Sequence, residues 1–303
     1  MFRYFEFSIC HRFDFNRKDT NKLRNKDEEL RKNSYLCNMD WEIIHIDETD
    51  STNRWLKAKA SEAEPLGCKP QTLRLQGLNP KDSDDIVVWT DYQTAGRGCG
   101  TNRWESERDK NLLFSLLLHP KQIPASQQFH ISMAISLSII EALRQHVFQP
   151  EDRSVARNGD LSIKWPNDIY WCDGKIGGIL IENALKGNVI KECIIGVGLN
   201  VNQRHFQSDA PNPISIWQIC KQETDREQLL KNILKCLDNY LYHDIKSQYI
   251  SMLYRRWGYH PYMDKNGTFM GEIVDVEDDG HLLLRDDNAH NRRYAFKEVQ
   301  FII

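Results

Sequence analysis

Two stretches of the 303-residue chain combine residue types that bind anions, and the first is the glycine-rich segment Asp91–Trp104. It follows an apolar run and contains Gly96, Gly98 and Gly100 around Arg97. Glycine-rich backbone can curl around a ligand and present N–H groups, and a guanidinium can fork onto phosphate or carboxylate oxygens. Read alone, the segment is equally consistent with an exposed surface loop. It is neither a Walker A nor a dinucleotide fingerprint, because no Gly-Lys-Ser/Thr follows and the glycine spacing differs.

The second stretch is Lys164-Trp165-Pro166-Asn167-Asp168. A lysine at the end of a short strand, beside a rigid proline turn, can be aimed into a cleft, where its compact ammonium suits an anionic reaction centre. Asn167 and Asp168 can form the turn through local hydrogen bonds. Asp168 can instead hold a metal ion. The alternative is an ordinary strand exit with a solvated lysine.

Two further stretches carry glycines inside predicted strands, at 174–182 and 194–202. Glycine weakens a strand, so its presence there marks a bulge or the close approach of a ligand to the backbone. Asn200 and Asn202 follow the second strand, where their amides could contact the edge of a nucleotide base.

The elements that must position these residues follow from hydrophobic periodicity and turn residues. We expect strands at 41–46, 85–90, 112–118, 161–165, 175–182 and 192–201, and helices beginning near 53, over 127–148 and over about 226–257. Short strands at 268–276, 281–285 and 292–296 are separated by Asp-rich turns. This pattern predicts an α+β fold, with one domain over 39–255 and a small β-barrel over 258–303.

Residues 1–38 read differently from the remainder, because they mix aromatic and charged residues without a clean period. They lack the continuous apolar region of a signal peptide. We expect a poorly ordered extension, with Met39 beginning the functional protein.

Composition narrows the class of protein. A net charge of −3 supplies no basic field that would hold nucleic acid or an anionic membrane. The eight cysteines contain no Cys-x-x-Cys pair, which favours scattered, reduced thiols over disulfides or zinc. No apolar run approaches the ~20 residues that span a bilayer. We therefore expect a cytoplasmic protein that binds neither nucleic acid nor membrane.

The order of the motifs is more specific than any one of them. Ser51-Thr52-Asn53, the 93–98 glycine segment, the Lys164–Asp168 turn and the two glycine strands follow one another as in the biotin–protein ligases, which the chain closely resembles. The match covers about residues 41–202, and the C-terminal β segment fits that family's SH3-like end domain. The resemblance implies a mixed-sheet catalytic domain of the class II synthetase type.

The resemblance also implies a reaction. Members of this family adenylate biotin with ATP and Mg²⁺, release pyrophosphate and pass biotin to a lysine of a biotin carboxyl carrier protein. Because two anions must meet, cations have to offset their repulsion, and a glycine loop that closes would shield the reactive anhydride from water. The expected protein is thus an ATP-dependent ligase that carries out protein biotinylation.

The family roles map onto single residues of this chain. Lys164 and Arg97 would be catalytic, because they stabilise the charge that builds up during transfer, and Asp168 would bind Mg²⁺. Biotin would contact Ser51, Thr52, Gln93, Gly96, Arg97, Lys164, Gly177 and Gly178. ATP or the adenylate would contact Arg97, Trp104, Lys164, Asn167 and Asn200.

One departure from the family concerns the segment after Gly-Arg-Gly. Family members often carry further basic residues there, whereas this chain has Cys99-Gly100-Thr101-Asn102, and Arg103 is the next cation. The loop would then hold the adenylate less firmly, or Arg103 would substitute. We interpret Cys99 as a tolerated small residue and not as a nucleophile.

Three other functions compete with this one. A lipoate–protein ligase shares the fold, but the Gly-Arg-Gly and Lys-Trp-Pro-Asn-Asp pair matches the biotin branch better. A biotin sensor or repressor needs a winged DNA-reading domain, for which the residues before Met39 are too few, so we predict no DNA binding. A plain nucleotide-binding module would bind ATP without an effect of biotin. Family members either form homodimers edge to edge through the central sheet or remain monomeric, and both states stay open.

Overall fold

The computed structural model describes residues 41–61, 71–74, 85–148, 161–207 and 212–303. The chain divides into two compact units, Met1–Cys37 and Asn38–Ile303. The predicted N-terminal extension over 1–38 and the predicted start at Met39 lie outside the described residues. Both β-sheets belong to the second unit, Asn38–Ile303.

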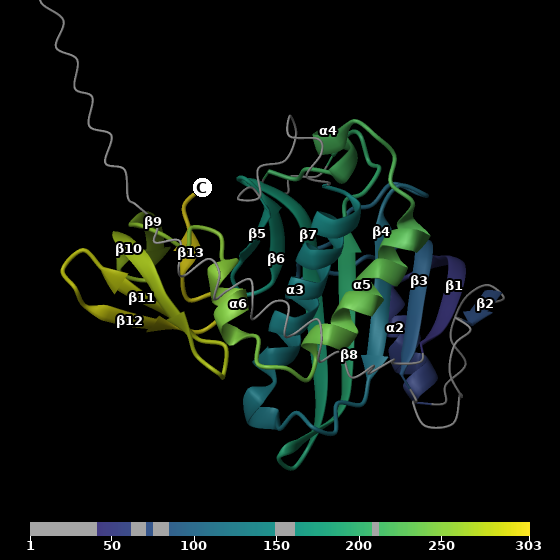
Figure 1. Cartoon of the computed structure of the whole chain (residues 1–303), viewed down its shortest axis with the longest axis horizontal. Helices are drawn as coiled ribbons and strands as arrows, with labels where there is room; N and C mark the ends of the chain where they lie inside the picture. Colours follow the sequence, from purple (N-terminus) through teal and green to yellow (C-terminus); the bar gives the residue numbers. More distant parts are fainter. Residues whose placement is uncertain (1–40, 62–70, 75–84, 149–160, 208–211) are drawn as a thin grey trace, which may run out of the picture. The chain divides into compact units, whose positions relative to one another are not determined.

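The larger sheet of this unit has eight strands in the order β2-β1-β3-β4-β8-β7-β6-β5 (Figure 1). β1 and β3 run parallel, and the other neighbouring strands pair antiparallel. The sheet is therefore mixed, as predicted. Its strands are β1 Glu42–Thr49, β2 Gln71–Arg74, β3 Ile86–Gln93, β4 Leu112–Leu118, β5 Leu161–Lys164, β6 Asp168–Trp171, β7 Gly174–Lys186 and β8 Val189–Leu199.

Helices cover the two faces of this sheet unequally. Side chains alternate between faces along a strand, so Phe114 of β4 joins the core beneath α3 and α5, while Leu117 joins a smaller core beneath α2. Figure 1 shows α3 and α5 side by side across one face. α2 packs Trp55 and Leu56 on the other face. The helices are α2 Thr52–Ala60, the 3₁₀ turn η1 Ala125–Gln127, α3 Phe129–His146, α4 Ile216–Cys220, α5 Arg226–Tyr240 and α6 Lys246–Ser251.

The C-terminal strands form a second sheet, in the order β12-β11-β10-β9-β13, with every pair antiparallel. Tyr262, Leu284 and Phe301 are buried in its core. The predicted small β-domain is present, but within the described strands no pairing joins β12 to β13, so the sheet does not close into the barrel we expected. Its strands are β9 His260–Asp264, β10 Gly267–Val276, β11 Leu282–Asp286, β12 Asn291–Tyr294 and β13 Gln300–Phe301.

The sequence prediction of one helix over 226–257 is wrong. α5 ends at Tyr240 and α6 begins at Lys246, where the backbone N–H of Lys246 donates to the Asp244 carboxylate. Such local side-chain bonds compete with helix continuation. The strand β9 was also not predicted from the sequence, because Pro261 is unusual in a strand that pairs on both sides. None of the described helices is long and apolar enough to cross a bilayer.

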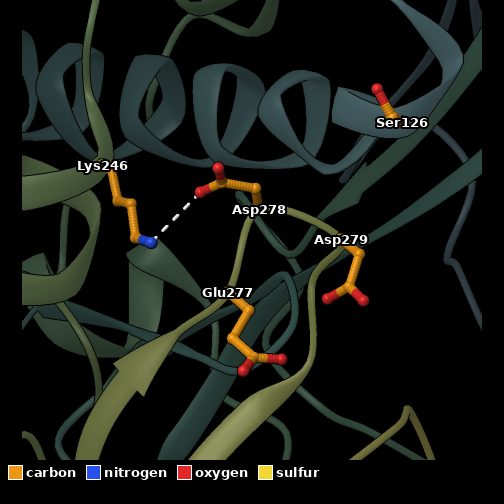
Figure 2. Close-up of a pocket in the computed structure, with 5 residues that line it drawn as sticks. All are labelled: Ser126, Lys246, Glu277, Asp278 and Asp279. Atoms are coloured by element: carbon orange, nitrogen blue, oxygen red, sulfur yellow. Dashed lines mark hydrogen bonds and ion pairs between the residues drawn. The ribbon is translucent and has the colours of Figure 1, made fainter.

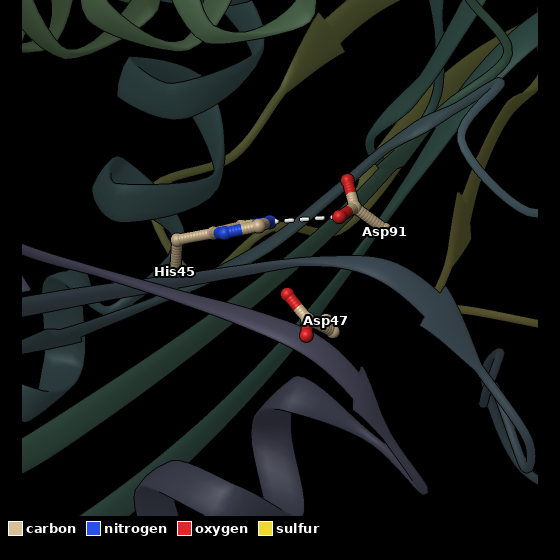
Figure 3. Close-up of side chains that lie close together, drawn as sticks. All are labelled: His45, Asp47 and Asp91. Carbon is tan, nitrogen blue, oxygen red and sulfur yellow. Dashed lines mark hydrogen bonds and ion pairs between the residues drawn. The ribbon is translucent and has the colours of Figure 1, made fainter. Parts of the chain in front are cut away.

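A charged cluster joins α5 to the sheet. Figure 3 shows His45 of β1 pointing at Asp91 of β3, with 3.0 Å between His45 Nε2 and Asp91 Oδ2, and Asp47 close by. Arg226 of α5 lies 2.9 Å from the other carboxylate oxygen of Asp91. The spacing of the three side chains in the figure would suit a metal ion. Because Arg226 already neutralises Asp91, we interpret the cluster as a structural ion pair.

We expect Asp91→Asn to lower the free energy of unfolding by about 2 kcal/mol, since it leaves the half-buried Arg226 guanidinium with only the more distant, exposed Asp109 carboxylate at 3.7 Å among the described residues. Chemical denaturation measures this. Asp47→Asn is the matched control, because Asp47 is exposed and should change stability little. Equal effects of the two variants would contradict a structural role for the Asp91–Arg226 pair.

Candidate active site

The glycine-rich segment forms a hydrogen-bonded hairpin over residues 96–104, which we call the glycine hairpin. Trp104 N–H donates to the Gly96 carbonyl at 3.1 Å, and Gly98 N–H donates to the Asn102 carbonyl at 2.8 Å. Gly100 lies at its tip with φ 71°, in the left-handed region that favours glycine. The segment is therefore a hydrogen-bonded hairpin whose tip, residues 100–103, is exposed.

Trp104, at the base of the hairpin, packs on the glycines of β7 and β8. Gly178 and Gly198 are paired across these strands. A Cβ built on Gly198 would lie 2.5 Å from Trp104 Cε2, and one built on Gly178 would lie 3.3 Å from Cζ3. The close approach predicted from the strand glycines is thus made here by an indole of the chain itself. The buried Trp104 Nε1–H has no acceptor among the described residues.

A polar network surrounds the start of α2 on the same face. The backbone N–H and the hydroxyl of Thr52 both donate to Gln93 Oε1, at 2.9 and 3.2 Å. Ser115 of β4 donates to Thr52 Oγ1 at 2.7 Å. Ser51 and Thr52 are buried, with exposed fractions of 2% and 3%. Three of the residues predicted to contact biotin are therefore brought together at one place.

Glu182 of β7 ties this network to the hairpin. Its carboxylate accepts hydrogen bonds from Asn53 at 2.9 Å and Lys57 at 2.7 Å, and Arg97 NH1 lies 3.7 Å away. Burial raises the pKa of Glu182, but the hydrogen bonds from Lys57 and Asn53 outweigh it and hold the pKa below its usual range. Glu182 is thus an anionic anchor for Arg97, a role that the sequence analysis missed.

Lys164 lies in a second, cationic cluster at the end of β5. Its Nζ is 5.4 Å from the ring centroids of both Tyr170 and Phe301. Burial lowers the pKa of Lys164, and the Asp168 carboxylate partly opposes that change.

Two further cations lie near Lys164. The charges of Lys175 and Arg255 also lower the pKa of Lys164. Lys175 Nζ forms a 2.7 Å ion pair with Asp168 Oδ2. Lys164 and Lys175 therefore share the Asp168 carboxylate, and Arg255 adds a third positive charge nearby, which makes the region suited to an anionic ligand.

The hairpin and the lysine cluster converge at Gly178. A Cβ built there would lie 3.3 Å from Trp104 Cζ3, 3.3 Å from Lys175 Nζ and 3.4 Å from Asp168 Oδ1. The structure thus brings the predicted residues Trp104, Asp168 and Gly178 together, and Lys164 lies within electrostatic range of them.

The predicted adenine contacts Asn167 and Asn200 are engaged with backbone. Asn167 Nδ2 donates to the Ile179 carbonyl at 3.2 Å. Asn200, 4% exposed, donates to the carbonyls of Lys175 at 3.3 Å and Ile214 at 3.2 Å. Both amides fix the edges of the site, and contact with a base stays a prediction. At Gly177, a Cβ would collide with Leu199, so that glycine serves strand packing.

Several known proteins are similar to this chain in sequence. Residues 68–200 match the biotin/lipoate A/B protein ligase family. A bifunctional ligase/repressor BirA of Bacillus subtilis is 26% identical over 230 residues, which cover 72% of this chain and 66% of that protein. A biotin–[acetyl-CoA-carboxylase] ligase of Paracoccus denitrificans is 26% identical over 69% of this chain and 87% of its own length.

A solved structure agrees in fold. The biotin protein ligase from Aquifex aeolicus in complex with biotin and ATP superposes with a TM-score of 0.63 at 23% identity, covering 86% of this chain and 99% of that one. Residues 68–200 carry a biotin/lipoate protein ligase domain. Together with the start of α2, this ligase domain places the polar network, the glycine hairpin and the lysine cluster on one face of the mixed sheet.

A separate hollow of about 450 Å³ lies away from the predicted residues of the ligase domain. Figure 2 shows its lining, in which Lys246 reaches Asp278 at 3.1 Å. Arg293 pairs with the two remaining acidic residues, Glu277 and Asp279. Each charged side chain of the lining therefore has an ion-pair partner within the chain, and we assign the hollow no part in the chemistry.

Gly198→Ala should lower the free energy of unfolding by about 2 kcal/mol, because the new methyl group overlaps the Trp104 ring. In a Trp104→Ala background the same change should cost much less, since the ring is gone. Gly178→Ala, with its longer 3.3 Å approach, should cost less than Gly198→Ala. Denaturant unfolding of the four variants tests this, and equal costs in both backgrounds would exclude the Trp104 contact.

Lys164→Met should raise the free energy of unfolding near neutral pH, because it removes a charge that burial disfavours. The ordinary lysine pKa is 10.5, and that of Lys164 is lower. Between the lower pKa of Lys164 in the folded protein and the ordinary lysine pKa of the unfolded chain, the folded protein loses the lysine proton first. The free-energy cost of burying the charge therefore disappears as pH rises through this interval, and the stability advantage of methionine shrinks. Unfolding curves at several pH values measure it. Lys175→Met breaks an ion pair and should have the opposite sign.

Proposed function

We propose that the protein is a biotin–protein ligase that adenylates biotin with ATP and transfers it to a lysine of a biotin carboxyl carrier protein. The observation that carries this proposal is the convergence at Gly178, where a cationic cluster meets a hairpin anchored by Arg97 and Trp104. A carboxylate and a triphosphate repel each other, so a site that brings them together needs an excess of fixed positive charge.

The residues divide the work of the first step. The biotin carboxylate would attack the α-phosphorus of ATP, forming the mixed anhydride and releasing pyrophosphate. Lys164 would stabilise the negative charge shared by the carboxylate and the α-phosphate, and Arg97 would bind phosphate oxygens from the hairpin. Thr52 and Gln93 would hydrogen-bond the polar ring of biotin, while Trp104 would pack against the ligand and exclude water.

The second step needs only an incoming amine. The ε-amine of a carrier lysine would attack the acyl carbon of the anhydride, forming an amide and releasing AMP. No nucleophile of the enzyme is required. We propose Thr52, Gln93 and Trp104 as groups that orient the anhydride, so that its carbonyl carbon stays accessible to the carrier.

Magnesium would enter with ATP. Asp168 offers it one carboxylate oxygen, Oδ1, because Lys175 holds the other. Mg²⁺ is commonly bound by one or two carboxylates together with substrate phosphates and waters, so Asp168 fits as a single protein ligand. Its charge would offset that of the β- and γ-phosphates. Cys99, Cys193 and Cys236 are free thiols, which supports a reducing compartment and thus a cytoplasmic ligase.

Pyrophosphate release from Mg-ATP should depend on biotin and not on lipoate, and it should fall by roughly 100-fold or more in Lys164→Ala, the scale of losing one transition-state charge contact. A coupled pyrophosphate assay with each acid, and with neither, measures this. Lys121→Ala, a substitution of an exposed lysine, is the control. Release driven by lipoate would move the protein to the lipoate branch. If folded protein releases no pyrophosphate with either acid, the enzyme function is wrong and a binding function remains.

A further inference from the structure

A lysine of the C-terminal sheet lies against the tip of the glycine hairpin. Lys297 belongs to the turn between β12 and β13, and a Cβ built on Gly100 would lie 2.7 Å from its Nζ. The ammonium therefore occupies the space that a side chain at position 100 would need. The hairpin thus spans from the strand glycines at its base to the second sheet at its tip.

The charge of Lys297 is not used within the described part of the chain. The arginines of the same sheet are each paired with carboxylates: Arg285 with Glu272, Arg292 with Asp264 and Asp286, and Arg293 with Glu277 and Asp279. Lys297 is exposed and forms no ion pair among the described residues, and its Nζ lies 5.8 Å from the centroid of the Phe296 ring. Its charge is therefore available to a ligand.

The backbone holds Lys297 in place. Its φ is 72°, in the left-handed region that costs a non-glycine residue free energy. The turn is closed by hydrogen bonds from Glu298 N–H to the Ala295 carbonyl at 3.1 Å and from Ala295 N–H to the Glu298 carboxylate at 2.8 Å. The turn thus fixes the backbone of Lys297, from which its exposed side chain reaches the hairpin tip.

The same sheet is tied to the strand that carries Lys164. The indole of Trp165 donates to the Gly280 carbonyl at 3.0 Å, and its ring meets Phe296 edge to face. The C-terminal sheet therefore contacts both the turn that follows Lys164 and the tip of the glycine hairpin. A lysine at this point lies at the rim of a site whose other cations are Arg97, Lys164 and Lys175.

We propose that Lys297 is a positioning residue that closes the glycine hairpin over the anionic adenylate. The inference rests on the proposed function. Its ammonium would favour the closed hairpin when a phosphate lies beneath the tip, and would slow the escape of the acyl-adenylate between the two steps. The hairpin tip has no cation of its own at residues 99–102, so the charge comes from the other sheet.

The experiment measures the release of biotinyl-adenylate from the full-length protein. The enzyme is charged with biotin and Mg-ATP, desalted, and chased with unlabelled biotin. Lys297→Ala should release the adenylate roughly five-fold faster, the size of one exposed charge contact, and Lys297→Arg should stay near wild type. Lys265→Ala, in the β9–β10 turn of the same sheet and equally exposed, should not change the rate.

Salt separates a charge effect from a packing effect. Raising the ionic strength should speed release from the wild type and have less effect on Lys297→Ala, because the screened charge is already absent. Gly100→Asn, which keeps a residue type tolerant of left-handed backbone, fills the space of the ammonium. It should mimic Lys297→Ala, and the double variant should be no faster than either single one.

The outcomes distinguish the two proposals. If the wild type forms no adenylate, the proposed function fails, and this inference fails with it. If the wild type forms adenylate but Lys297→Ala releases it as slowly as Lys265→Ala, the inference alone is wrong. Additive effects of Gly100→Asn and Lys297→Ala would also overturn it, because the two positions would then act independently.

Discussion

The arrangement of the site depends on one electrostatic constraint, the excess of positive charge held around Asp168. Lys175 pairs with that carboxylate, Lys164 lies in its field, and Arg255 adds a further positive charge near Lys164, so the cluster carries more positive charge than Asp168 alone offsets. A buried cation costs free energy because it loses water. This cost is partly offset because the Lys164 ammonium lies near the rings of Tyr170 and Phe301 and near the Asp168 carboxylate. These groups favour the charged form of Lys164, and Asp168 forms its ion pair with Lys175.

Glycines of the sheet make the rest of the site possible. Gly196 leaves room for Asn53, Gly198 for the indole of Trp104, and Gly178 for the meeting of the hairpin with the lysine cluster. Any side chain at these positions would push the α2 network or the hairpin away from the sheet. The flat surface of β7 and β8 thus sets the distance between the polar end of the site, at Thr52 and Gln93, and its cationic end.

The sequence predicted most of the strands and the residues with local signatures. Gln93, Arg97 and Lys164 could be predicted because each lies in a contiguous motif, although partners such as Thr52 for Gln93 and Glu182 for Arg97 are distant in sequence. Glu182 and Ser115 were missed because their roles arise from pairing across the sheet, although a lone serine in the apolar strand Leu112–Leu118 was a usable signal. The strand glycines predicted a close approach, but only the structure identifies Trp104 as its partner.

The C-terminal sheet could not be assigned a role from its sequence, because nothing in its composition says which surface it meets. The structure changes this. Trp165, the residue beside Lys164, donates a hydrogen bond to the Gly280 carbonyl of that sheet, and Phe301 supplies one of the two rings against the Lys164 ammonium. A rotation of the sheet would therefore alter the environment of the principal cation and move the hairpin tip together. The five-stranded sheet thus contributes both to the surroundings of the Lys164 ammonium, through Phe301, and to the contact with the hairpin tip, through Lys297.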